Sequence, residues 1–282
     1  MGTGFAEAPL AVFTTLAPMG AGAFLLLAGA FFLSKIDDGA LARIDKMTFI
    51  PIVVAIVGFI GAFFHLASPL HAFGVFAGIG SSPLSNEIAA GVLFMAVAIV
   101  YAVLAAMGKL SAGARKGFAA AVAVVAVAFM AFCGLAYMMN TIPTWDTPAS
   151  VIQMLGCGIM GGGALGALVL GCARVEATPQ LRGLAAALCA TGLVIGAIGF
   201  GMQVMLAGSV FNIWGSAADL VPALWGMFAA FVVCGVATVV LVFAAGRKNF
   251  SVSLSAAAFA LAAIGVFVAR IAFYGLYMGV AL

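Results

Sequence analysis

MTFIPIVVAIVGFIGAFFHLA, residues 47–67, contains no Asp, Glu, Lys or Arg. A helix needs about 20 predominantly apolar residues to cross the hydrocarbon core of a bilayer. This run is long enough, and it lacks the alternation of polar and apolar residues that a barrel strand would show. It therefore predicts a transmembrane helix.

Similar runs fill the sequence on both sides of this segment. Hydrophobic residues make up 66% of the sequence and charged residues 7%, with a mean hydropathy of +1.32. A soluble domain carries about 25% charged residues, so lipid must cover this surface. We expect an all-α integral membrane protein of eight transmembrane helices in a compact bundle, with residues 1–282 forming a single membrane domain. The spans are expected near residues 9–33, 47–67, 86–108, 117–139, 151–172, 181–207, 220–245 and 252–279.

The basic residues separate the loops into two classes. Ten of the eleven lie in or beside the first, third, fifth and seventh loops, whereas the second, fourth and sixth loops have none. The positive-inside rule then places the odd loops in the cytoplasm and both termini on the extracytoplasmic side. The basic residues form no stripe, so no nucleic-acid partner is expected. The ten residues are Lys35, Arg43, Lys46, Lys109, Arg115, Lys116, Arg174, Arg182, Arg247 and Lys248.

Small residues and aromatic residues predict how the helices pack. The five cysteines form no CxxC pair, so we expect no metal site and interpret them as small packing residues. Pro18 predicts a kink in the first span, and Trp145 and Trp214 are expected at headgroup level. Glycines at four-residue spacing predict close helix contacts. They are Gly158, Gly162 and Gly166 in one span, and Gly192 and Gly196 in the next.

Polar side chains within the spans gather at one depth, just below the outer surface. Ionisable groups inside a membrane cost about 2.5–3.5 kcal/mol each, so they are functional candidates by default. Each also has a structural explanation, as a helix cap, a headgroup contact or an interhelical hydrogen bond. They are His65, Glu87, Gln203 and Arg270, accompanied by Asn140, Thr14 and Thr15.

A quinol is the ligand that suits such a shallow polar cluster. Haem is not expected, because His65 and His71 are the only histidines and lie six residues apart on either side of Ser68-Pro69. A transporter would carry its polar residues nearer the midplane. A quinol can enter from lipid, and its hydroxyl groups need an acceptor that titrates near neutral pH, as histidine does.

The sequence closely resembles the membrane anchor subunit of DMSO reductase, the DmsC-like family. The similarity runs through its whole length in order, and the histidine segment with SNEIA is its most specific part. Tyr277, where the family can carry histidine, and Pro18 depart from the pattern. The matching segments are EAPL (7–10), HLASPLHAF (65–73), SNEIA (85–89), TIPTW (141–145), MQ (202–203) and RIAFYGL (270–276).

The resemblance implies a respiratory complex in the cytoplasmic membrane of a prokaryote. A molybdopterin catalytic subunit reduces the terminal acceptor, and a ferredoxin-like subunit with four iron–sulfur clusters relays the electrons. The anchor binds and oxidises menaquinol, with His65 and Glu87 in catalytic and quinol-binding roles. From their depth, Gln203 and Arg270 are expected to complete the binding site.

Other functions stay open from the sequence. The protein could be the quinone-interacting anchor of another oxidoreductase, such as a polysulfide-reductase-like complex. A transporter and a purely structural anchor are further alternatives. The terminal acceptor is chosen by the molybdenum subunit, so this sequence does not identify it.

Overall fold

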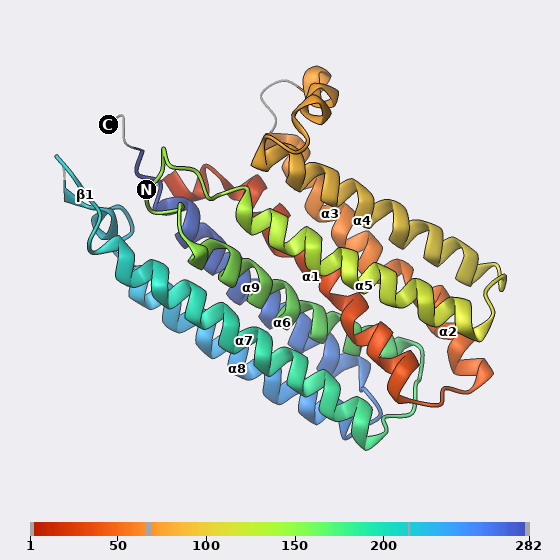
Figure 1. Ribbon diagram of the computed structural model, residues 1–282. Coiled ribbons are helices and arrows are strands. Elements are labelled where there is room, and N and C mark those ends of the chain that lie inside the picture. Colours follow the sequence, from red (N-terminus) through yellow and green to blue (C-terminus); the bar gives the residue numbers. More distant parts are fainter. Residues whose placement is uncertain (1–2, 66–68, 214, 280–282) are drawn as a thin grey trace.

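The fold is an antiparallel array of membrane-spanning helices. The computed structural model describes residues 3–65, 69–213 and 215–279. Within them, eight helical segments are long and apolar enough to cross a membrane, which confirms the predicted number of spans. The spans run back and forth, with α4 along one edge and α7 and α8 along the other (Figure 1).

The described residues form nine α-helices and a few short elements. The helices are α1 (Ala8–Leu33), α2 (Asp38–Met47), α3 (Phe49–His65), α4 (Pro83–Ala106), α5 (Ala112–Leu135), α6 (Pro148–Cys172), α7 (Pro179–Ala207), α8 (Leu224–Gly246) and α9 (Val252–Gly275). The short elements are 3-10 helices η1 (Thr3–Phe5), η2 (Pro69–Gly78) and η3 (Ala217–Leu220), and a hairpin of β1 (Phe211–Asn212) and β2 (Gly215–Ser216).

Hydroxyl side chains that cap their first turns fix where several helices begin. Ser82, Ser111, Thr147 and Thr178 each accept a hydrogen bond from a backbone N–H in the first turn of α4, α5, α6 and α7. Such caps satisfy N–H groups that have no partner inside the helix. These helices consequently begin two to five residues before the predicted starts at 86, 117, 151 and 181.

The connection between the first two spans contains a helix of its own. Residues 38–47 form α2, which continues into α3 as one 28-residue segment. Arg43 Nε donates to the carbonyl oxygen of Ala173, 2.7 Å away, at the end of α6. The Arg115 guanidinium makes a two-point contact with Asp45, at 3.0 and 2.7 Å. These bonds tie α2 to both α6 and α5.

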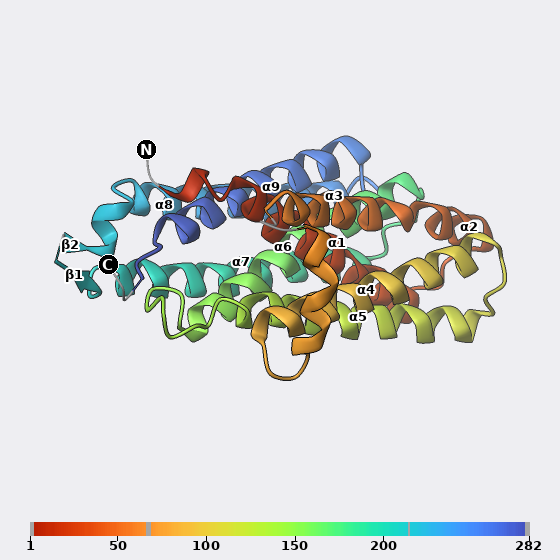
Figure 2. The same cartoon turned by 90° about the horizontal axis from the view of Figure 1, so that it is seen from above.

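Helices α1 and α6 form the interior of the array. In the most apolar 18-residue stretch of each, 72% and 78% of the residues are buried, against 22–44% in the other six spans. Figures 1 and 2 show other helices on both sides of α1 and α6. A Cβ added to Gly162 would lie 2.3 Å from the carbonyl carbon of Gly22, and one added to Gly156 would lie 2.1 Å from the backbone nitrogen of Gly196. The predicted role of these glycines in close packing is therefore confirmed.

Substitution of Gly162 with alanine should destabilise the protein, because the new methyl group would meet the backbone of α1, which cannot rotate away. We expect a loss of about 1–3 kcal/mol, the usual effect of overpacking. Gly183→Ala is the matched control, because nothing lies within 4 Å of its added Cβ. There alanine should stabilise the helix by up to about 1 kcal/mol. Thermal unfolding of both variants in detergent measures the difference, and equal shifts would contradict the packing described.

Candidate functional site

Arg270 on α9 is fully buried and is the centre of the largest polar cluster inside the spans. Its Nε donates to Thr14 Oγ1 on α1 at 3.0 Å, and one terminal nitrogen donates to Gln153 Oε1 on α6 at 2.9 Å. The other terminal nitrogen lies 3.5 Å from the hydroxyl oxygen of Tyr274. Among the described residues no carboxylate lies within ion-pair distance of this guanidinium. Arg270 therefore does not snorkel to the headgroups, and it forms no ion pair with Glu87.

Aromatic rings supply much of what surrounds this charge. The guanidinium carbon lies 4.0 Å from the ring centroid of Phe273, and slightly farther from those of Tyr274 and Tyr137. A cation over an aromatic face is attracted by the ring quadrupole, more strongly where water is absent. The hydroxyl groups of Tyr137 and Tyr274 are 2.5 Å apart, which links α9 to the end of α5.

The connection between α5 and α6 closes this cluster at the C-terminal end of α9. Trp145 Nε1 donates to the carbonyl oxygen of Phe273 at 2.8 Å, and Thr144 Oγ1 donates to that of Leu276 at 2.6 Å. These carbonyl groups belong to the last turn of α9, where helical partners are lacking. Trp145 is 8% exposed, so its role is to hold the connection against α9 and not to face headgroups. Trp214 lies outside the described residues.

Glu87 is a buried carboxyl group near the start of α4. It is 4% exposed, and its Oε1 has no hydrogen-bond partner. Its side chain lies beside the thiol of Cys133 on α5. The first turn of α4 contains no acidic residue, so Glu87 lies beyond the turn in which the positive end of the helix dipole would stabilise it, the structural explanation considered for this residue. A buried carboxyl group without a full set of partners is costly and marks a candidate ligand site.

His65 ends α3 and pairs with a residue that the sequence did not single out for the site. Its Nδ1 lies 3.1 Å from Oε2 of Glu7, directly before α1, and the two side chains are 42% and 34% exposed. The end of α3 and the start of α4 lie at the same end of the array, beneath the projecting η2 (Figure 1). His71 falls in η2, where its side chain is outside the described residues.

The other predicted polar residues lie apart from these contacts. Gln203 is buried on α7 and lies within 3.5 Å of Ser150 Oγ, leaving its own Oε1 without a partner. Asn140 is exposed in a turn. The sequence missed Gln153 on α6, Tyr137 just after α5 and Tyr274 on α9, which all contact Arg270. The i+4 spacing of Tyr274 from Arg270 was the available signal.

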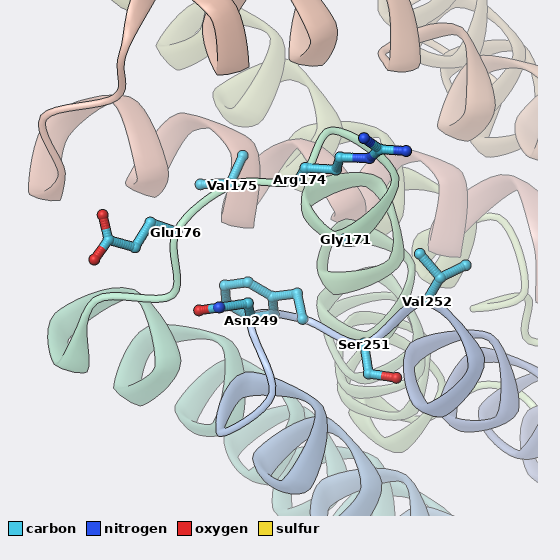
Figure 3. Close-up of a pocket in the computed structure, with 8 residues that line it drawn as sticks. Gly171, Arg174, Val175, Glu176, Asn249, Ser251 and Val252 are labelled. Carbon is cyan, nitrogen blue, oxygen red and sulfur yellow. The ribbon is translucent and has the colours of Figure 1, made fainter.

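Two hollows lie on the surface. The larger, about 360 Å³, sits at the opposite end of the array between the α6–α7 and α8–α9 connections, where Arg174 and Asn249 line it (Figure 3). It contains none of the predicted site residues. A groove of about 290 Å³ runs between α1 and α9 and is lined by apolar side chains and Thr15. The Thr15 hydroxyl is buried without a partner.

In the described part of the protein, no three His, Cys, Asp or Glu side chains are grouped closely enough to hold a metal ion. The five cysteines are all free, and three of them are fully buried. Cys189 donates from its thiol to the carbonyl oxygen of Met160 on α6. These contacts agree with the interpretation of the cysteines as packing residues.

Residues 1–276 match the family model described as DMSO reductase anchor subunit (DmsC). The protein belongs to this family. As a DmsC-family protein it is a multi-pass membrane anchor subunit of a DMSO reductase complex, and an anaerobic respiratory role fits this family. The residues matched by the family model include the His65 segment, Glu87 and Arg270.

Curated relatives agree with the DmsC family over nearly the full length. The sequence is 31% identical to the C subunit of anaerobic dimethyl sulfoxide reductase from Escherichia coli K12, and the match covers 99% of this protein and 98% of that one. It is 29% identical to the corresponding C subunit from Haemophilus influenzae, with 99% and 97% covered. The anaerobic dimethyl sulfoxide reductase subunit YnfH of Escherichia coli is 34% identical over 62% of this protein and 61% of its own length.

Replacing Arg270 with lysine should destabilise this DmsC-family protein although the charge is kept. An ammonium group has no planar fork and cannot reach acceptors on α1, α6 and α9 together. We expect a loss of about 3 kcal/mol or more, as for a buried charge deprived of its partners. Arg247→Lys, at an exposed position after α8, is the control. Detergent unfolding should separate the two variants clearly, and equal stability would show that the hydrogen bonds of Arg270 are dispensable.

Proposed function

We propose that this protein oxidises menaquinol at His65 and passes the electrons to an iron–sulfur subunit of its complex. The observation that carries the proposal is a half-exposed histidine at the outer end of α3, in a membrane anchor whose buried Glu87 carboxyl group has an unpartnered oxygen. A neutral imidazole accepts the hydrogen bond of a quinol hydroxyl and takes its proton. Because the deprotonated quinol is the stronger reductant, this transfer lowers the barrier to electron loss.

Glu87 acts in this proposal as a second polar contact for the quinol. Its unpartnered Oε1 is sealed from water by its surroundings, so a ligand hydroxyl arriving from lipid would be its hydrogen-bond partner. Arg270 and Gln203 have different roles. The guanidinium of Arg270 already donates hydrogen bonds to Thr14, Gln153 and Tyr274. Its role in this proposal is to fix the helices that surround the site. Gln203 lies on α7, where its amide nitrogen donates a hydrogen bond to Ser150 Oγ on α6.

The groove between α1 and α9 is suited to an apolar ligand, because apolar side chains line most of it. Val12 lines this groove and also faces α3, since a Cβ added to Gly61 would lie 3.2 Å from Val12 Cγ1. Gly61 is one turn before His65. An isoprenoid tail entering along the groove would bring its head group toward the end of α3. A quinol needs such an apolar path leading to a polar end.

The partners follow from the family. We propose a four-cluster ferredoxin-like subunit docked on the outer face, near residues 68–85, 140–150 and 208–219, and a molybdopterin catalytic subunit beyond it. Electron transfer needs a cluster near His65, because we assign this protein no haem or other redox centre of its own. The complex would lie in the cytoplasmic membrane of a prokaryote.

Replacing His65 with alanine should lower quinol oxidation by about 10²–10⁴-fold, the usual contribution of a positioned acid–base group. The measurement is oxidation of a menaquinol analogue by the purified complex. Activity with an artificial reductant, which feeds the catalytic subunit directly, should remain unchanged and shows that the complex has assembled.

His71→Ala is the matched variant, because His71 is the only other histidine in the sequence, and we expect it to keep quinol turnover. If the His65 variant oxidised quinol at the unmutated rate while the artificial reductant worked normally, the quinol site would lie elsewhere. That result would favour a purely structural anchor or a site that does not use a histidine.

The charge asymmetry of the loops gives a separate prediction. Ten basic residues on the odd connections favour a cytoplasmic position for those connections, and hence extracytoplasmic termini. A reporter that is active only in the cytoplasm should give no signal when fused to the C-terminus. Fusion of the same reporter within residues 107–111, between α4 and α5, should give a strong signal. The reverse pattern would overturn the topology and the proposed outer location of the site.

A further inference from the structure

Glu7 occupies the position before α1 without serving as its cap. Its backbone lies at the N-cap, yet its side chain makes no capping hydrogen bond. Carboxylates at this position normally accept from a backbone N–H of the first turn. The side chain is therefore available for another role, and a structural cap does not account for it.

The carboxyl group of Glu7 is directed at His65. Oε2 lies 3.1 Å from His65 Nδ1. That oxygen is itself shielded from solvent, and no described residue donates to it a hydrogen bond of normal geometry. The imidazole at 3.1 Å is therefore the polar group that faces it. The first helix contains no charged residue and α3 contains only His65, so no other group on either helix competes for the contact. Helix α9 also packs against α1, but its Arg270 side chain donates a hydrogen bond to Thr14, two turns farther along α1 than Glu7.

The packing of α1 against α3 holds the pair in place. A Cβ added to Gly61, one turn before His65, would lie 2.7 Å from the carbonyl oxygen of Pro9 and 3.2 Å from Val12 Cγ1. The two helix backbones thus approach closely within one turn of both residues. Glycine here sets the spacing that brings a carboxylate on one helix to an imidazole on the next.

We infer that Glu7 is the positioning residue of His65 and the acceptor of the proton that His65 takes from quinol. The inference rests on the proposed function. A carboxylate at Nδ1 holds the proton on that nitrogen, so Nε2 is left with its lone pair to accept from the quinol hydroxyl. The same carboxylate fixes the plane of the ring.

The transfer balances as a relay of one proton. The quinol O–H bond breaks and an N–H bond forms at Nε2, while the N–H bond at Nδ1 breaks and an O–H bond forms at Oε2 of Glu7. The imidazole ends neutral with its proton on the other nitrogen. The electron that accompanies this proton reduces the iron–sulfur cluster of the partner subunit. Oε2 itself is shielded, but the Glu7 side chain as a whole is 34% exposed, so rotation of the carboxyl group would bring the proton to the surface of the protein.

The test compares Glu7→Gln with Glu7→Asp in the purified complex. Glutamine keeps the size of the side chain but cannot hold the charge, so kcat for menaquinol-analogue oxidation should fall by about 10- to 100-fold, as for other carboxylates that orient a histidine. KM should change little. Aspartate keeps the charge and should recover part of the loss. Glu176→Gln, an exposed position at the opposite end of the array, is the matched control and should behave like the unmutated complex.

The pH profile separates a proton acceptor from a merely structural residue. The acidic limb of log kcat/KM reports groups of the free complex that must be deprotonated. With Glu7 and His65 both required, its limiting slope approaches 2; in Glu7→Gln it should fall to about 1. An unchanged profile and unchanged kcat in Glu7→Gln would overturn the inference, as would an aspartate variant no better than glutamine. If Glu7 failed these tests while His65→Ala still lost quinol turnover, the proposed function would stand without the relay.

Discussion

A buried positive charge is the constraint on which the half of the molecule around the end of α9 depends. The Arg270 guanidinium has lost its hydration, and an isolated charge in such surroundings costs several kcal/mol even after relaxation. The cost is offset by acceptors on α1 and α6 and by ring faces around the charge. Every helix that contributes a partner is thereby fixed in rotation as well as in position. Thr14, which accepts from Arg270, cannot turn away from α9 without exposing the charge.

The helix ends where quinol chemistry is proposed are more exposed than the tightly packed interior. Helices α1 and α6 approach neighbouring backbones through glycine, and at such contacts no side chain can shift to absorb a change. The residues proposed for quinol chemistry lie near the ends of their helices, at the end of the array where α3 ends and α4 begins. His65 and Glu7 are partly exposed, whereas Glu87 is buried. The site therefore combines a pair that can exchange protons with water and a carboxyl group that cannot do so directly.

The sequence predicted the helices far better than it predicted the pairs of side chains. Apolar runs and loop charges are local signals, so eight spans followed from composition and the positive-inside pattern alone. His65, Glu87, Gln203 and Arg270 were singled out because a polar residue in a span is rare. Their partners depend on helix rotation, which apolar composition does not specify: these spans are apolar on nearly all sides. Glu7 was noted only as part of the matching segment EAPL, and only the packing of α1 against α3 brings it to His65.

The charged connection that begins with α2 has a consequence for the order of assembly. Basic residues retain a connection in the cytoplasm while the protein is still being inserted, before the spans have packed. In the folded protein, Arg43 donates a hydrogen bond to the carbonyl oxygen of Ala173 at the end of α6, and Arg115 makes a two-point contact with Asp45. In the topology proposed above, the same side chains would act first as a retention signal and later as tertiary anchors. The first role depends only on charge and tolerates lysine. The second depends on the geometry of a guanidinium, so evolution toward lysine at either position would keep the topology while loosening the inner end of the array.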